Sequence, residues 1–89
     1  MNKLSNYQRN VLLEVYTKGL YIVTNEGANF KCWLEDKTGF KYKGVNKRTV
    51  EILFKEGYIV DLKNDKKSFN IFRYELSDRT LNYIKKMKL

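Results

Sequence analysis

The chain contains no histidine and no proline, and it has a single cysteine, Cys32, and a single tryptophan, Trp33. One cysteine cannot close a disulfide within the chain, and without histidine the usual ligand set of a tetrahedral zinc site is missing. We therefore expect no disulfide, no metal and no cofactor, and the cytoplasm is the expected compartment.

Long apolar runs are also missing. The first nine residues lack the apolar stretch of a signal peptide, and no run of 18 apolar residues, the length that spans a membrane, occurs in the sequence. With 89 residues and a hydrophobic fraction of 43%, the chain is expected to form one domain, residues 1–89, without a membrane partner. Aromatic rings should supply much of its single small core.

Positive charge is what the sequence has in excess. Eighteen Lys and Arg residues stand against ten Asp and Glu residues, which gives a net charge of +8. Such an excess favours association with nucleic-acid phosphates or with acidic protein surfaces. A basic composition with no binding role would give the same charge, so charge alone leaves both readings open.

A capping box marks the first helix. The hydroxyl of Ser5 can accept a hydrogen bond from the amide of Gln8, whose side chain can reach back to the amide of Ser5. Apolar residues then recur at helical spacing as far as Gly19, a residue that can adopt the left-handed conformation that ends a helix. The sequence predicts a helix over residues 6–18.

Extended segments follow this helix. Branched and aromatic residues at 20–24 and 29–34 flank a cluster of turn residues, which indicates a hairpin. In the second strand Cys32 should face the core, and Trp33 should lie on the opposite face. Trp33 then either packs over the sheet or forms an exposed stacking platform for a base. Residues 36–45 contain either a short helical turn or a third strand.

The second helix has the clearest start and stop signals. Asn46 is a favourable N-cap, Val45 can pack on Val50 as a hydrophobic staple, and Gly57 can end the helix. We expect this helix over residues 46–56. Its expected inward side chains are Val50, Leu53 and Phe54.

A two-stranded ribbon should follow, with strands at 58–62 and 69–76 joined by the polar turn 63–68. Ser77 can cap a last helix over about 78–87. The predicted fold class is α+β, winged-helix-like, with the order α-β-β-(β)-α-β-β-α.

The run from Thr49 to Ile59 and the sequence Tyr74-Glu75-Leu76-Ser77 resemble the winged-helix superfamily, and most closely its small phage and prophage members. The resemblance implies that residues 46–56 form a recognition helix and that the 58–76 ribbon forms the wing. One feature departs from the family, because residues 20–45 favour strands where a helix-turn-helix has its positioning helix.

Candidate contacts to nucleic acid lie at three places. Cations gather before and at the start of the second helix, whose free amides also favour an anion. Arg48 can bind a guanine edge, and Glu51 can accept from cytosine. The ribbon tip can reach a neighbouring backbone. A solvated basic surface or a merely hydrophilic turn is the alternative for each place. The candidate residues are Lys41, Lys43, Lys47, Arg48, Glu51, Lys55, Lys63, Asn64, Lys66 and Lys67.

The resemblance and the charge together predict a small DNA-binding protein, a phage-type transcriptional regulator whose partner is double-stranded DNA. The alternative is a phage-encoded module that inhibits or adapts a host protein, and a third reading is single-strand binding through Trp33 and Tyr42. Catalysis is not expected, since no nucleophile motif or phosphate loop is present. A homodimer would use the first and last helices through Leu13, Tyr83 and Leu89. The sequence does not identify the target.

Overall fold

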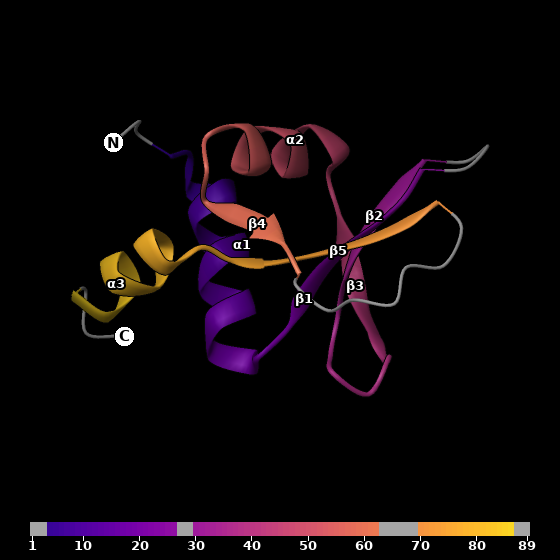
Figure 1. Ribbon diagram of the computed structural model, residues 1–89, viewed down its shortest axis with the longest axis horizontal. Coiled ribbons are helices and arrows are strands. Elements are labelled where there is room, and N and C mark those ends of the chain that lie inside the picture. The colour runs from indigo at the N-terminus through magenta and orange to yellow at the C-terminus, as the bar shows by residue number, and fades with distance from the viewer. Residues whose placement is uncertain (1–3, 27–29, 63–69, 87–89) are drawn as a thin grey trace.

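The computed structural model describes residues 4–26, 30–62 and 70–86. Within them, three helices and one five-stranded antiparallel sheet follow the order α-β-β-β-α-β-β-α (Figure 1). The α+β class is confirmed, and the region that was left open between 36 and 45 holds a third strand rather than a helical turn.

The helices are α1 (Asn6–Lys18), α2 (Lys47–Lys55) and α3 (Asp78–Lys86). The strands are β1 (Tyr21–Asn25), β2 (Lys31–Glu35), β3 (Lys41–Val45), β4 (Ile59–Asp61) and β5 (Ile71–Leu76). No helix among the described residues is long and apolar enough to cross a membrane. The predicted ribbon tip, 63–68, and the last predicted helical residue, Met87, lie outside the described residues.

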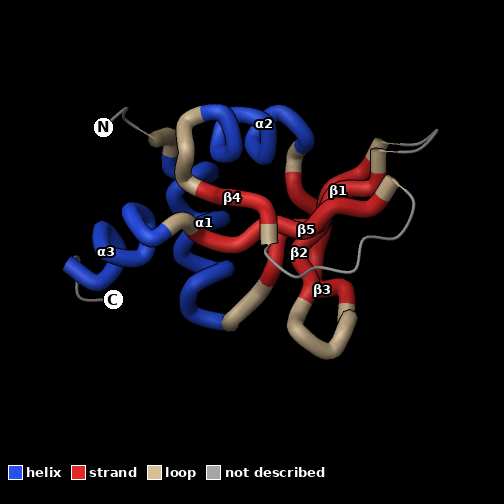
Figure 2. The backbone as a smooth tube through the Cα atoms, viewed as in Figure 1, coloured by secondary structure: helices blue, strands red, loops and turns tan. Residues whose placement is uncertain are grey.

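The sheet has the strand order β3-β2-β1-β5-β4, with every neighbouring pair antiparallel (Figure 2). β1 lies at the centre and pairs with both β2 and β5. The strands that precede α2 and the two that follow it therefore belong to one sheet. β2 and β3 are joined through an irregular register, which shifts between Leu34 and Glu35.

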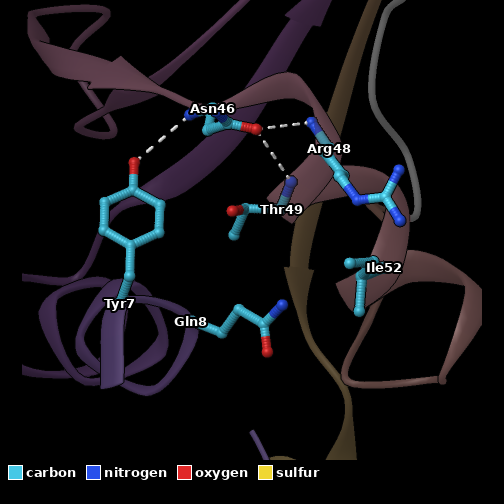
Figure 3. A pocket seen from close by; sticks show the side chains of 6 residues that line it. All are labelled: Tyr7, Gln8, Asn46, Arg48, Thr49 and Ile52. Atoms are coloured by element: carbon cyan, nitrogen blue, oxygen red, sulfur yellow. Dashed lines mark hydrogen bonds between the residues drawn. The ribbon is translucent and has the colours of Figure 1, made fainter. Parts of the chain in front are cut away.

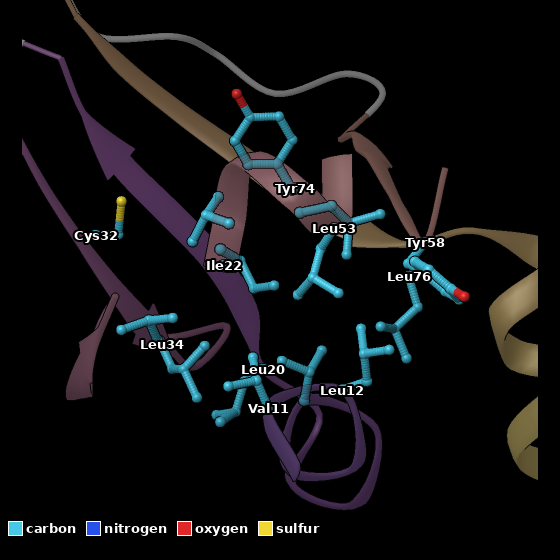
Figure 4. Close-up of a cluster of buried hydrophobic side chains, with 14 of the residues drawn as sticks. Val11, Leu12, Leu20, Ile22, Cys32, Leu34, Leu53, Tyr58, Tyr74 and Leu76 are labelled. Carbon is cyan, nitrogen blue, oxygen red and sulfur yellow. The ribbon is translucent and has the colours of Figure 1, made fainter. Parts of the chain in front are cut away.

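Alternation along the strands gives the sheet two different faces. On the inner face Ile22 and Leu34 have no exposed surface, and they belong to one hydrophobic cluster with residues of all three helices, including Leu53 of α2 (Figure 4). Burial of each such side chain stabilises the fold by roughly 1.5–3 kcal/mol. The outer face carries Trp33 and Arg73, which are only partly buried.

Local signals account for where the helices start and stop. The Ser5 hydroxyl accepts from the Gln8 amide at 3.1 Å, and the Gln8 side chain accepts from the Ser5 amide at 3.0 Å, which confirms the capping box. Gly19 and Gly57 have φ of 64° and 80°, the left-handed region that favours glycine at the ends of α1 and α2. The predicted bounds of α1 are confirmed.

The predicted inward stripe of α2 is wrong at one position. Val50 and Leu53 are buried, but Phe54 is 47% exposed, and its ring meets the edge of Tyr74 with the centroids 5.2 Å apart. Thr49 occupies the third inward position instead, at 6% exposed. The inward stripe is therefore rotated toward Thr49, and a large apolar side chain, Phe54, is left at the helix surface.

Candidate nucleic-acid interface

α2 is a nine-residue helix with two chemically different sides. Its inner side is fixed in the core through Val50 and Leu53. Its outer side carries four predicted contact residues, all exposed, namely Lys47, Arg48, Glu51 and Lys55. A short helix that is anchored in this way presents its outer side chains from a rigid element.

The amino-terminal end of α2 is closed by hydrogen bonds. The Asn46 side chain accepts from the amides of Arg48 and Thr49 at 2.8 and 3.3 Å, and the amide of Asn46 donates to the Tyr7 hydroxyl at 3.2 Å (Figure 3). These amides are not free, which corrects the expectation that they would attract an anion. At these three positions, phosphate attraction must come from side chains.

A hollow of about 560 Å³ lies between the first turns of α1 and α2. Figure 3 shows Arg48 on the α2 side, with Gln8 of α1 across from it. The Arg48 side chain makes no hydrogen bond or ion pair to another described residue, so its guanidinium donors can serve a ligand. The residues that line the hollow are Tyr7, Gln8, Asn46, Arg48, Thr49 and Ile52.

Lys47 begins the next exposed row of α2. Its ammonium nitrogen lies 4.3 Å from the centroid of the Phe30 ring. A smaller hollow of about 250 Å³ adjoins it, lined in part by Glu51, Phe54 and Tyr74. This side of α2 is therefore both charged and apolar.

The cations of β3 do not join those of α2. Lys43 pairs with Glu14 of α1 at 2.6 Å, and Lys18 contacts the other oxygen of the same carboxylate at 3.0 Å. Hydrogen bonding to Lys43 is the main reason why the pKa of Glu14 is lowered. Lys18 also donates to the Tyr42 hydroxyl at 2.6 Å, and this bond, with Glu14, raises the pKa of Lys18.

Lys41 faces another way. Its ammonium nitrogen lies over the Trp33 ring, 4.2 Å from the ring centroid. Lys41, Lys43 and Lys47 thus have three different partners, and Arg48 borders the larger hollow, so the single cationic cluster expected at the start of α2 is not formed. The other candidates, Lys63, Asn64, Lys66 and Lys67, lie outside the described residues.

The sequence reasoning missed two arrangements. One is the Tyr7 to Asn46 hydrogen bond, which joins residues 39 positions apart and leaves no local sequence signal. The other is a polar network on the outer sheet face, in which Glu35 accepts from Trp33 at 3.3 Å and from Arg73 at 3.2 Å. Alternation in β2 places Trp33 and Glu35 on one face, but Arg73 arrives only through the pairing of β5 with β1.

No known protein family, curated protein or solved structure matches this chain. Among residues 4–26, 30–62 and 70–86, no three His, Cys, Asp or Glu side chains are grouped in a way that could hold a metal ion. Geometry and charge therefore carry the functional assignment.

Proposed function

We propose that this protein binds double-stranded DNA through the outer face of α2 and acts in the cytoplasm as a transcriptional regulator of the phage or prophage type. The observation that carries the proposal is the set of three exposed cations, Lys47, Arg48 and Lys55, on a short helix whose other side is packed into the core. We further propose that it has no enzymatic activity.

The side chains of α2 suit a major groove. The groove admits an α-helix, arginine can bind guanine with two hydrogen bonds, and lysine attracts phosphate as a point charge. In this pose Arg48 contacts a base edge, while Lys47 and Lys55 contact the backbone on either side. Glu51, between them, can accept from the amino group of cytosine.

The proposed fold type is winged-helix-like. Support comes from the succession of a capped helix, α2, and an antiparallel pair, β4 and β5, which takes the place of a wing. The β2–β3 hairpin stands where a positioning helix would precede a recognition helix. α2 is instead positioned by its contacts with β2 and β4, and by the bond between Tyr7 and Asn46.

Fluorescence anisotropy with a labelled duplex of mixed sequence tests this function. We expect binding by the wild type and at least about a tenfold loss of affinity in the double variant Lys47→Ala, Arg48→Ala. The matched control is the double variant Lys85→Ala, Lys86→Ala, which also removes two cations, both from the exposed surface of α3, and should leave affinity within about twofold. Equal duplex affinity in the wild type and the double variant would refute the proposal.

Phe54 favours a second candidate function, a module that binds a host protein. Its ring is 47% exposed and borders the smaller hollow beside Lys47. Aromatic anchors next to a shallow hollow are common in protein interfaces. In a pull-down from nuclease-treated host lysate, this function predicts one saturable partner that is lost with Phe54→Ser and retained with Arg48→Ala. Loss of every captured protein upon nuclease treatment would exclude it.

A further inference from the structure

We propose that the outer face of the sheet, opposite α2, binds single-stranded nucleic acid, with Trp33 as the stacking platform. This surface shares no residue with the outer face of α2, so the inference goes beyond the duplex binding proposed above. The surface is defined by Trp33, Glu35 and Arg73 together with Lys31 and Lys41.

Strand pairing sets these residues in adjacent rows. In the central row Trp33 of β2 lies opposite Val23 of β1 and Gly44 of β3, and Val23 in turn lies opposite Arg73 of β5. Val23 has no exposed surface although it lies on the outer face and outside the main core cluster. Gly44 brings no side chain to the row, so the β3 side of Trp33 is not walled off.

The indole is held in place by its neighbours. Its N–H donates to one oxygen of Glu35 at 3.3 Å, and Arg73 binds the other oxygen at 3.2 Å. Glu35 is only 8% exposed, so the carboxylate that Trp33 binds is compensated by Arg73 within the protein rather than presented to a polyanion. A fixed aromatic ring next to an internally neutralised acid suits stacking, because little ordering remains to be done upon binding.

Lys41 covers the Trp33 ring, so a base gains access to the ring only when the Lys41 side chain moves away. Its ammonium lies over Trp33 at 4.2 Å, at the end of an exposed and flexible side chain. An exposed cation–π contact changes an equilibrium constant by up to about fivefold, whereas one stacked base changes it by about five- to 150-fold. A base can therefore replace the ammonium on the ring while Lys41 moves to the adjoining phosphate.

The rest of the hairpin has the same character. Lys31 is exposed in the row next to Trp33, and Lys37 is exposed in the β2–β3 turn. Phe40 follows in that turn and is 63% exposed, with its amide bound to Asp36 at 2.9 Å. The hairpin thus carries a partly buried ring, Trp33, an exposed ring, Phe40, and several exposed lysines, a combination of aromatic groups and cations that can track a single strand.

Trp33 is the only tryptophan of the chain, so its own fluorescence reports on the site. The experiment titrates the full chain with oligo-dT and oligo-U of about ten nucleotides, a length that matches common single-strand sites. We expect saturable quenching of Trp33 emission with at least one of them, and their relative affinities distinguish DNA from RNA. The quenching should persist in the Lys47→Ala, Arg48→Ala double variant.

Labelled oligonucleotides extend the test to variants without the fluorophore. Trp33→Leu should lower single-strand affinity about tenfold or more, while the exposed-site variant Lys41→Gln should lower it about two- to fivefold without affecting folding. Duplex affinity should be unchanged in both. Three results would each overturn the inference: no quenching of Trp33, equal single-strand affinity of Trp33→Leu and the wild type, or loss of single-strand binding in the α2 double variant. None of these results would refute duplex binding by α2.

Discussion

The two faces of the sheet are built from alternate residues of the same strands, yet they are stabilised differently. In β2, Cys32 and Leu34 face the helices and are buried, whereas Trp33 lies on the outer face in a network with Glu35 and Arg73. The inner face is held mainly by the burial of apolar side chains, which is non-directional. The outer face also depends on hydrogen-bond geometry, in the network that Glu35 forms with Trp33 and Arg73.

The helices make the same division. α1 and α2 contribute their apolar sides to the inner face, and α2 is left with cations on its other side. The proposed duplex surface and the proposed single-strand surface therefore lie on opposite sides of one small core. Some substitutions should therefore lower the stability of the fold and others should lower binding, depending on the face of the sheet on which the residue lies.

The largest contrast is expected between two neighbours in β2. Leu34→Ala opens a cavity in the inner face and should lower the free energy of unfolding by about 2–5 kcal/mol. Trp33→Leu, one residue earlier, should lower it by about 1 kcal/mol, since the ring is only partly buried. Urea denaturation followed by far-ultraviolet circular dichroism measures both. Equal losses of unfolding free energy in the two variants would show that the two faces of β2 contribute equally to stability.

The outer network gives the next largest effect. Glu35→Ala removes the acceptor for both Trp33 and Arg73 and should lower the free energy of unfolding by about 1–3 kcal/mol. Trp33 emission should shift as the indole loses its partner. The control is Glu75→Ala, on the same face of β5, with an expected change of about 0.5 kcal/mol or less. A Glu35 variant as stable as this control would contradict a fixed network.

Substitution of Asn46, the N-cap of α2, tests how the helix end contributes to stability without opening a cavity in the core. Asn46→Ala leaves two amides without their acceptor and should lower the free energy of unfolding by about 1 kcal/mol, and Asn46→Asp should retain most of that stability. Neither variant should alter Trp33 emission in the folded state. A change in emission would mean that the two faces are coupled through β3.

The smallest effect is the pH-dependent one, at the edge of the inner face. Glu14 has a lowered pKa, chiefly through its hydrogen bond to Lys43, so its contribution is present above the ordinary carboxyl value and lost as pH falls through the lowered pKa. Glu14→Gln should cost about 0.5 kcal/mol at neutral pH, because both lysines are largely exposed. The cost should shrink as pH falls below the ordinary carboxyl value, and it should vanish once pH lies below the lowered pKa of Glu14. A pH-independent difference would rule out the charge as its source.

Local signals made much of the fold predictable. Ser5 with Gln8, Asn46 and the two glycines Gly19 and Gly57 specify helix ends within a few residues of themselves. The alternation of β2 likewise gave the two faces. Each of these signals depends on backbone geometry close in sequence, which is why the sequence alone sufficed.

Long-range pairing made the rest inaccessible. Lys43 is close to α2 in sequence, but its side chain binds Glu14 of α1. The pairing of β3 with β2 determines the face of the sheet on which Lys43 lies. Helical spacing predicted that Phe54 faces the core, but Thr49 is buried there instead, and the Phe54 ring packs against Tyr74 at the surface. Arg73 of β5 lies near Trp33 and Glu35 of β2 only because β1 pairs with both of these strands. The sequence therefore did not predict which side chains lie together, and the proposed contacts to nucleic acid stay predictions.

The salt dependence of duplex binding tests the central claim, that α2 contacts the phosphate backbone, most directly. Between about 50 and about 200 mM salt, the logarithm of the binding constant should fall linearly with the logarithm of salt concentration. The slope should be smaller by about one unit in Lys47→Ala and unchanged in Lys85→Ala. Identical slopes for the wild type and Lys47→Ala would contradict a backbone contact by α2.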